Sequence, residues 1–506
     1  MGGTQLLVGD LGRRGAHLWA DRPALTAGGR TTTYGELWGS ASRMAELLGR
    51  EGAGVGTRVA LLSWNLPECL EVLFAASWIG AVVVPLNARL TPEEIRFQVD
   101  DAGVTLAVVD PALEGLAADA GLLEGRHLVV GPKLDQALAE ARGLADRAVD
   151  DPEAPCIQLY TSGTTGRPKG ALLTNRAWVA STANVVHGLG LTAEDRLLGV
   201  YPFFHVAGLG FALGIVSVGG QVVVPPAAGP DAVWATTDEH RLTLTCLPGM
   251  SAALSHPAAK THRPFLRGVI GGANMEAPQA LERLGELLPG ARFYGVYGST
   301  EAGNLVTITS APEELERPGT IGRPLPCFDV AILDEHDAEM APGEVGELAL
   351  RGPSTMSGYW HLPDETAKAQ AAGWLHTGDL MRRDGDGYLY FVDRSKDMVK
   401  TGGENVYSIE IETVLAAHPE VADVAVIGVP DRRWGEAVKA VVVASSAHLA
   451  PETLDDWCRE RLAPFKRPRW YELVDAIPRS TTGKILKRDL RASHDAARAV
   501  RLQERT

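Results

Sequence analysis

The stretch that decides the fold of this sequence is Tyr160-Thr-Ser-Gly-Thr-Thr-Gly-Arg-Pro-Lys-Gly170. It places five hydroxyl side chains, three glycines and two cations in one short segment. Glycine adopts backbone angles closed to other residues, so such a segment can approach a ligand closely. Hydroxyl and amide groups donate to phosphate oxygens, and the cations offset their charge. The segment therefore predicts a phosphate-binding loop with contacts from Thr161, Ser162, Gly163, Thr164, Thr165, Gly166 and Lys169.

This loop differs from the Walker type. The Walker motif places its lysine directly before a serine or threonine that leads into a helix. Here Pro168 precedes Lys169 and Gly170 follows it. Because proline disfavours the α conformation at Arg167, we expect the loop to join two strands. The alternative, a flexible surface linker, is disfavoured by this order of residues.

Length and charge limit the functional classes. A chain of 506 residues exceeds what one hydrophobic core usually supports, so we expect two or more domains. Hydrophobic residues make up 45%, as in globular proteins, and the formal net charge is −15. That charge argues against a nucleic-acid or anionic-membrane partner. A phosphate ligand would therefore depend on local positive clusters.

The cysteines and the apolar segments predict a cytoplasmic protein. The five cysteines are scattered and lack metal-binding spacing, so we expect core thiols in a reducing compartment. The N-terminus lacks the charged and apolar pattern of a signal peptide. The most apolar run, residues 66–86, contains Glu68, Glu71 and Pro85. It is typical of a buried helix followed by a strand and not of a membrane span.

Apolar runs alternate with amphipathic stretches over roughly the first 390 residues. Such alternation predicts parallel sheets covered by helices. The Ala-rich segment from Glu114 to Asp151 is expected to be a peripheral helical excursion and a loop. From about Phe391 the pattern changes to a helix at Ser408–His418, strands at 424–429 and 437–444, and a helix near Leu454–Leu462. This order predicts a small α+β domain of about 110 residues.

Four further segments accompany the loop. They are Tyr297-Gly-Ser-Thr-Glu301, Thr377-Gly-Asp-Leu380, Asp393-Arg-Ser-Lys-Asp-Met-Val-Lys-Thr-Gly-Gly-Glu-Asn405 and Pro478-Arg-Ser-Thr-Thr-Gly-Lys484. In this order the set resembles the adenylate-forming superfamily of acyl-CoA synthetases, carrier-protein adenylation domains and luciferases. The resemblance runs from about Tyr34 to about Arg488.

The resemblance implies a fold and a reaction. The fold class is α/β: a large N-terminal domain of helix-covered parallel sheets, residues 1–395, and a small mobile α+β domain, residues 396–506. The hinge is expected near Lys396. The implied reaction is ATP-dependent acyl-CoA ligation, with ATP, CoA and Mg²⁺ as cofactors. A homodimer is compatible with the sequence.

The ATP residues follow from the matched motifs. Tyr297 ends an apolar strand next to Gly298 and would lie on adenine, although a lone tyrosine here is more often a core residue. Thr300 would contact the α-phosphate, and the Glu301 carboxylate would bind Mg²⁺, which prefers oxygen ligands. A Thr-Glu pair without these neighbouring motifs is more often a solvent-exposed pair on the protein surface. The other residues implied for the nucleotide are Gly272, Ala273, Asp379 and Arg394, the last two at the ribose.

The same resemblance implies a two-step reaction. Lys484 lies on a Gly-containing loop, and it would neutralise the acyl carboxylate and the α-phosphate while the carboxylate attacks ATP. The CoA thiol then attacks the acyl-adenylate and AMP leaves. Rotation about Lys396 would withdraw Lys484 and bring Thr401, Gly402 and Gly403 to the site, where side-chain-free backbone can line a pantetheine tunnel.

Four small-domain residues favour CoA as the thiol. Arg467 and Arg469 match phosphate contacts of aryl-CoA ligases, and Trp434 and Phe465 match residues that flank the CoA adenine. A basic and aromatic surface cluster is the alternative interpretation of these residues. Two alternative functions are open. One is a stand-alone adenylating enzyme that loads a carrier protein, and the other is a nucleotide-binding protein that catalyses no reaction.

The acid substrate is less well defined by the sequence. His205 matches the histidine that gates the acyl pocket, and small residues follow it at 207–214 and 248–253. Small residues at wall positions leave room for a bulky ligand. Malonate-activating relatives carry an arginine near the second run, and none is present here. The partner is therefore predicted to be a bulky, apolar carboxylic acid: aryl, alicyclic, branched or medium-chain.

Overall fold

The computed structural model divides into two compact units. The N-terminal unit comprises Met1–Ala331, Ala349–Thr377 and Asp384–Tyr390, and the C-terminal unit comprises Ile332–Leu348, Gly378–Arg383 and Phe391–Thr506. The structure describes residues 6–161, 167–247, 249–272, 278–402, 404–446, 448–479, 485–495 and 498–502. The chain passes between the units within strands β16 (Asp329–Leu333), β17 (Val345–Arg351), β19 (Leu375–Arg383) and β20 (Leu389–Arg394).

The first sheet of the N-terminal unit has the strand order β18-β8-β7-β4-β3-β5-β6. The strands from β7 to β6 are parallel, and β8 and β18 are antiparallel additions at one edge. Its strands are β3 (Arg58–Leu62), β4 (Val82–Leu86), β5 (Val104–Val109), β6 (His127–Val129), β7 (Pro155–Thr161), β8 (Lys169–Thr174) and β18 (Gly358–Tyr359).

The second sheet of this unit runs in the order β15-β14-β13-β12-β11-β9-β10-β1-β2. Strands β13 to β1 are parallel, with β14, β15 and β2 antiparallel at the two ends. They are β1 (Pro23–Ala27), β2 (Arg30–Thr33), β9 (Arg196–Leu198), β10 (Gln221–Val223), β11 (Leu244–Cys246), β12 (Gly268–Gly272), β13 (Arg292–Ser299), β14 (Asn304–Thr309) and β15 (Thr320–Pro324).

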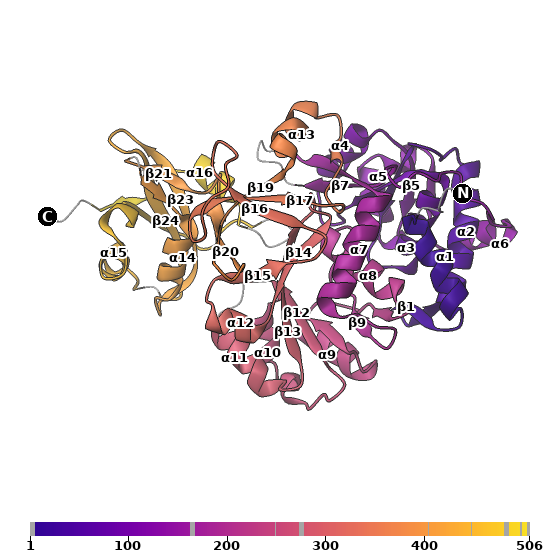
Figure 1. Cartoon of the computed structure of the whole chain (residues 1–506), viewed down its shortest axis with the longest axis horizontal. Helices are drawn as coiled ribbons and strands as arrows, with labels where there is room; N and C mark the ends of the chain where they lie inside the picture. The colour runs from indigo at the N-terminus through magenta and orange to yellow at the C-terminus, as the bar shows by residue number, and fades with distance from the viewer. Residues whose placement is uncertain are drawn as a thin grey trace. The chain divides into compact units, whose positions relative to one another are not determined.

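Helices cover these sheets. In the core beside β12 and β13, Val269 and Phe293 pack with Trp234 of α9, Met250 of α10 and Leu284 of α11 (Figure 1). The helices of this unit are α1 (Val8–Trp19), α2 (Tyr34–Arg50), α3 (Pro67–Ile79), α4 (Pro92–Ala102), α5 (Glu114–Asp119), α6 (Pro132–Glu140), α7 (Asn175–Leu189), α8 (Val206–Ser217), α9 (Pro230–Glu239), α10 (Met250–Ser255), α11 (Pro278–Leu287), α12 (Ala311–Glu316) and α13 (Pro363–Ala369).

Local sequence signals explain where these helices begin and end. Thr33 caps α2 by accepting from the backbone N–H of Glu36, whose carboxylate accepts from the N–H of Thr33 at 2.8 Å. The apolar run at 66–86 forms the buried helix α3 and strand β4, as predicted, with Pro67 in the first helical turn and Gly80 at φ +76° after the last. Proline at the start and glycine at the end match the preferences of helix termini.

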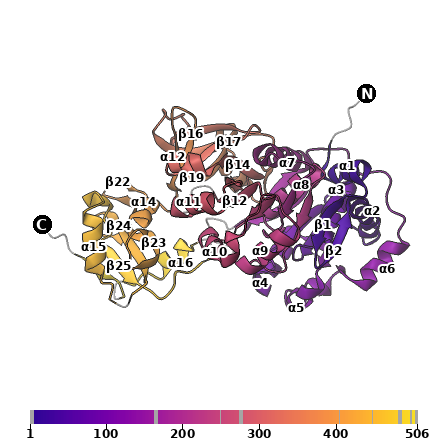
Figure 2. The same ribbon diagram turned by 90° about the horizontal axis from the view of Figure 1, so that it is seen from below.

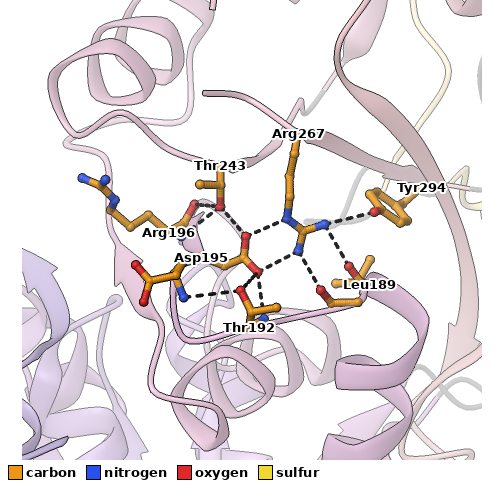
Figure 3. A network of polar contacts seen from close by, with 9 residues as sticks. Leu189, Thr192, Asp195, Arg196, Thr243, Arg267 and Tyr294 are labelled. Carbon is orange, nitrogen blue, oxygen red and sulfur yellow. Dashed lines mark hydrogen bonds and ion pairs between the residues drawn. The ribbon is translucent and has the colours of Figure 1, made fainter. Parts of the chain in front are cut away.

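An ion pair between the buried Asp195 and the partly exposed Arg267 ties segments of the second sheet to the end of α7 (Figure 3). Arg267 binds both oxygens of Asp195, at 2.6 and 2.8 Å, and donates to the Leu189 carbonyl and the Tyr294 hydroxyl, each at 3.1 Å. The hydroxyl of Thr243 donates to Asp195 at 2.7 Å. These contacts join the end of α7 to the residues just before β9, β11 and β12 and to Tyr294 of β13. The network therefore supports the strands that lead to the predicted site.

The C-terminal unit has a six-stranded sheet with α14 (Ser408–Ala416), α15 (Pro451–Arg459) and α16 (Lys487–Ala492). Alternate residues of β23 enter two cores: Val426 packs with Leu415 of α14 and Leu454 of α15, and Ile427 packs with Leu490 of α16. Figure 2 shows α14 and α15 beside β24 and β25. The strands are β21 (Val399–Thr401), β22 (Glu404–Val406), β23 (Val421–Asp431), β24 (Gly435–Ala444), β25 (Trp470–Leu473) and β26 (Val500–Arg501).

One sequence expectation needed correction. The segment from Glu114 to Asp151 contains the strand β6, which pairs with β5 beyond the expected helices and loop. This strand has only three residues, too few for an alternating pattern to stand out. Both sheets of the N-terminal unit are parallel in the centre, as expected, with antiparallel strands at one edge of the first sheet and at both ends of the second. In the described part of the chain, no helix is long and apolar enough to span a bilayer. The five cysteines are free thiols, all buried except the partly exposed Cys327.

Candidate active site

The phosphate-loop segment joins two antiparallel strands, as the sequence predicts. Strand β7 ends at Thr161 and β8 begins at Lys169, and these two residues are partners in the register. The hydroxyl of Tyr160 donates to Asp101 at 2.6 Å, which fixes the end of β7 to the end of α4. Eight predicted site residues lie outside the described part of the chain: Ser162, Gly163, Thr164, Thr165, Gly166, Ala273, Gly403 and Lys484.

Lys169 is buried, with 8% of its surface exposed. Its ammonium lies 2.5 Å from Glu365 and 5.1 Å from the ring centre of Tyr359. The hydrogen bond from Lys169 is the largest cause of a lowered pKa at Glu365, ahead of the contact with Lys368. A cation therefore lies at the first residue of β8, where the predicted loop returns to the sheet.

Thr300 and Glu301 follow β13 directly. The Tyr359 hydroxyl donates to Oε1 of Glu301 at 3.0 Å, and the Met356 N–H donates to the Glu301 carbonyl at 2.8 Å. A carboxylate held by one oxygen keeps the other available for a hard cation. Gly298 lies so close to the next strand that an added Cβ would be 1.7 Å from the Asn304 carbonyl. Any side chain at Gly298 would displace β14.

Tyr297 and Gly272 lie on neighbouring parallel strands, where Gly272 pairs with Val296. Tyr297 is partly exposed, in contrast to the buried Tyr294 on the same strand. The alternative of a core tyrosine therefore describes Tyr294 and not Tyr297. A partly exposed ring beside a glycine edge can stack on a planar ligand.

The small residues after His205 do not have the role expected from the sequence. His205 precedes α8 and its ring lies 4.9 Å from that of Phe204. A Cβ at Gly208 would lie 2.2 Å from the Pro202 carbonyl, and one at Gly210 would lie 1.9 Å from Nδ2 of Asn304. These glycines allow close packing of α8 on its neighbours. They do not in themselves leave room for a ligand, which corrects the argument made from residue size.

In the C-terminal unit, Asp379 and Arg394 form the predicted pair. Nε of Arg394 lies 3.1 Å from Oδ1 of Asp379, and Asp379 is 3% exposed. The backbone that places Asp379 includes Gly378 at φ +73°, a conformation that favours glycine. The Gly378 N–H donates to Glu347 at 2.7 Å and its carbonyl accepts from Ser395 at 2.9 Å.

The predicted hinge lies within a polar network of the C-terminal unit. Asp393 accepts from the backbone N–H of Ser408 and, at 2.8 Å, from its hydroxyl. Burial raises the pKa of Asp393, and the charge of Lys487 opposes that rise. Burial lowers the pKa of Lys396, and the neighbouring Arg394 charge adds to the effect. The Lys396 residue itself is exposed, beside this network in the chain.

Two of the four predicted CoA residues, Trp434 and Arg469, lie beside Gly402. The Gly402 N–H donates to the Trp434 carbonyl at 2.8 Å, and a Cβ at Gly402 would lie 2.7 Å from the Trp434 ring. The Arg469 guanidinium lies 4.7 Å from the centre of the same ring. Thr401, next to Gly402, is buried and pairs with Gly435. The indole therefore packs on backbone that only glycine allows, and it carries a cation on its face.

The remaining two CoA residues have local contacts. Phe465 is 38% exposed and the Lys466 ammonium lies 5.8 Å from its ring centre. Nε of Arg467 donates to the Leu462 carbonyl at 3.1 Å. One guanidinium N–H of Arg467 is therefore already used in a hydrogen bond to a residue nearby in the sequence.

Sequence reasoning missed Tyr359 and Glu365. Both lie in Gly358-Tyr-Trp-His-Leu-Pro-Asp-Glu365. They contact Glu301 and Lys169, two residues that the motifs identify. A tyrosine and a glutamate six positions apart carry no signal of their own, because the folding of β18 onto β8 creates their contacts.

Comparison with known proteins gives a consistent result. The family models for "AMP-binding enzyme" and "AMP-binding enzyme C-terminal domain" match residues 13–360 and 410–484. A feruloyl-CoA synthase of Amycolatopsis sp is 39% identical over 94% of this chain and 97% of its own. The fatty acid–[acyl-carrier-protein] ligase ScoC of Streptomyces coeruleorubidus is 37% identical over 94% and 95%.

A solved structure extends this similarity to the fold. The o-succinylbenzoate coenzyme A synthetase MenE of Bacillus subtilis, in complex with ATP and a magnesium ion, is 29% identical, with a TM-score of 0.84 over 95% of this chain and 98% of its own. Both family models and the full-length relatives agree with the five motifs. The chain therefore belongs to the AMP-binding enzyme family and is an AMP-forming acyl-CoA synthetase.

Proposed function

We propose that this protein activates an aromatic or similarly bulky, apolar carboxylic acid and transfers it to CoA. The acid carboxylate attacks the α-phosphate of ATP, which gives an acyl-adenylate and pyrophosphate. The CoA thiol then attacks the acyl carbonyl, loses its proton and releases AMP. Full-length similarity to a feruloyl-CoA synthase is the observation that carries this proposal.

The described residues of the N-terminal unit suit the nucleotide. Glu301 offers a carboxylate oxygen, the ligand that Mg²⁺ prefers. Bound there, the ion would neutralise phosphate charge. Lys169 is a buried cation at the end of the phosphate loop, and Tyr297 offers a partly exposed ring to adenine. We assign Thr300 to the α-phosphate and His205 to the entrance of the acyl pocket.

Residues of the C-terminal unit complete the proposed assignments. The Asp379 carboxylate, held by Arg394, would accept both hydrogen bonds of the ribose diol. Trp434 and Arg469 would hold the adenine and a phosphate of CoA. Lys484 would neutralise the reacting carboxylate, and residues 396–506 would move as one domain about Lys396. The scattered free thiols suit a reducing cytoplasm.

The proposed class of acid rests on the similarity to the feruloyl-CoA synthase. The glycines of α8 do not support it, because neighbouring atoms fill the space beside them. Pyrophosphate release should be measured across hydroxycinnamic, benzoic, medium-chain fatty and malonic acids, each with and without CoA. We expect the highest kcat/KM with an aromatic acid and full turnover only with CoA. Preference for malonate or for short acids would refute the proposed substrate class.

A carrier-protein ligase remains the second candidate. It is favoured by the similarity to ScoC over 94% of the chain. The two functions separate when a phosphopantetheinylated carrier replaces CoA in the same assay. Acylation of the carrier at a rate well above that of CoA would replace the first proposal by the second.

A further inference from the structure

We propose that Tyr359 and Glu365 are positioning residues of the active site, Tyr359 for Glu301 and Glu365 for Lys169. The inference rests on the proposed function, because it gives Glu301 and Lys169 their roles toward the metal and the phosphates. It assigns a task to the segment Gly358–Thr366, which the five motifs leave out.

The backbone of this segment is fixed beside both target residues. Strand β18 pairs antiparallel with β8, the strand that begins at Lys169. The Trp360 N–H donates to the Gly170 carbonyl at 2.7 Å, and the Met356 N–H donates to the Glu301 carbonyl at 2.8 Å. Tyr359 therefore lies between two backbone hydrogen bonds, one to each side of the site.

The Tyr359 hydroxyl fixes one carboxylate oxygen of Glu301. It donates to Oε1 at 3.0 Å. Glu301 and the tyrosine ring are both partly buried. A hydrogen bond to a charged group is stronger than one between neutral groups. The bond therefore limits rotation of the carboxylate and leaves its second oxygen for a cation.

Glu365 fixes the Lys169 ammonium at 2.5 Å in the same way. Lysine has several rotatable bonds, and a buried ammonium without a counter-charge is costly. The pair holds the Lys169 ammonium in one place at the first residue of β8 before the phosphates bind. Glu365 also contacts Lys368 at 3.3 Å, so its remaining charge is partly compensated at the surface.

The two positioning residues are linked to each other. The Tyr359 N–H donates to the Thr366 hydroxyl at 2.9 Å, which ties β18 to the first turns of α13. Gly358, at φ +151°, lies where a Cβ would meet the Thr366 methyl at 2.7 Å. This close contact brings Glu365 and Tyr359 to one edge of the sheet. The segment Gly358–Thr366 therefore holds Tyr359 beside Glu301 and Glu365 beside Lys169.

The first test uses Tyr359→Phe with Tyr388→Phe as its matched control. Tyr388 donates to Oε1 of Glu313 at 3.1 Å, the same chemistry outside the proposed site. Mn²⁺ binding is followed by electron paramagnetic resonance in the presence of α,β-methylene-ATP, which cannot donate its adenylyl group because the methylene bridge between its α- and β-phosphates is not cleaved. We expect Tyr359→Phe to weaken Mn²⁺ binding about tenfold, the effect of one hydrogen bond to a charged group. Tyr388→Phe should bind Mn²⁺ as the parent does, and equal binding by both variants would overturn the role of Tyr359.

The second test uses Glu365→Gln with the exposed neighbour Asp364→Asn as control. Binding of the same analogue is measured by calorimetry in EDTA, where no metal contributes. Glu365→Gln should weaken nucleotide binding severalfold, because the Lys169 ammonium is no longer held, while Mn²⁺ affinity at saturating analogue stays unchanged. Tighter nucleotide binding would show that Glu365 competes with the phosphates, and it would overturn the positioning role.

The parent protein separates this inference from the proposed function. If the parent does not bind the analogue, the proposed function fails. If the parent binds it and both variants behave as their controls do, only the positioning inference fails. Because the two variants use independent readouts, failure of one variant to fold leaves the other as a test.

Discussion

Two charged residues that we assign to the nucleotide are each held by a residue of opposite charge. Asp379 has Arg394 at 3.1 Å and Lys169 has Glu365 at 2.5 Å. Both of these proposed nucleotide-binding residues thus have a fixed partner of opposite charge in their own unit. Pre-set charges of this kind need little reorganisation when a substrate arrives, which is the main source of electrostatic catalysis.

Lys484 gives the sharpest prediction at this scale. Lys484→Ala should lower pyrophosphate release by roughly 10²–10³, the scale of losing one preorganised electrostatic contact. Transfer from a chemically supplied acyl-adenylate to CoA should persist, because we assign the lysine to the first step only. Both half-reactions are followed by single-turnover assays. Equal loss in both would show that Lys484 is not specific to adenylation.

Arg469 and Arg467 test the CoA assignment. Arg469→Ala should raise the KM for CoA about tenfold, because it removes a charge-assisted contact and the cation on the face of Trp434. Arg467→Ala should have a smaller effect, since Nε of Arg467 already donates to the Leu462 carbonyl. The KM for ATP should hardly move in steady-state assays. An unchanged KM for CoA in the double variant would favour a carrier protein.

At the scale of elements, helix α3 places the ionisable side chain of Glu71 in an apolar environment. The helix is buried on all sides, and Glu71 within it is 2% exposed. Burial, followed by the charge of Glu68, raises the pKa of Glu71 to about 8. The folded state therefore holds this proton more tightly than the unfolded state does. Its stability contribution is complete at acid pH and is lost as pH rises through about 8.

Glu71→Gln should remove this pH dependence. Between the unfolded pKa and about 8, the parent should lose at most about 1.4 kcal/mol of stability per pH unit through this group. The variant should therefore become more stable than the parent as pH rises from 5 to 9. Urea unfolding at several pH values measures the difference, with the exposed Glu93→Gln as control. A constant difference across this range would show that Glu71 is ionised in the folded protein.

At the scale of the whole molecule, the chain forms two units, each built from three separate stretches of sequence. Residues 332–348 and 378–383 belong to the C-terminal unit, so the division is not a single cut along the chain. Asp379 is one of the residues in these segments. A movement of the C-terminal unit could therefore carry more of the site than residues 396–506 alone.

The hinge prediction belongs to this scale. Lys396→Pro would fix φ at the residue expected to absorb the rotation. One half-reaction should survive and the other should fall, according to which orientation is trapped. Adenylation and thioester formation are measured separately on the same preparation. If Lys396→Pro retains both, the rotation is absorbed elsewhere.

The sequence by itself determined the family, the strands on both sides of the phosphate loop, and the α3–β4 unit. These features depend on local order: hydroxyl and glycine spacing, proline before Lys169, and unbroken apolar runs. Residues such as Glu301 and Asp379 were identified in this way, because their motif neighbours are adjacent in the chain.

Only the tertiary structure decided what surrounds those residues. Tyr359 meets Glu301 and Glu365 meets Lys169 across long sequence separations, and no local pattern encodes a pairing of β18 with β8. The glycines of α8 likewise suggested an open pocket until Asn304 and the Pro202 carbonyl were found against them. Residue size says how much volume a side chain takes, whereas packing decides whether that volume is already filled.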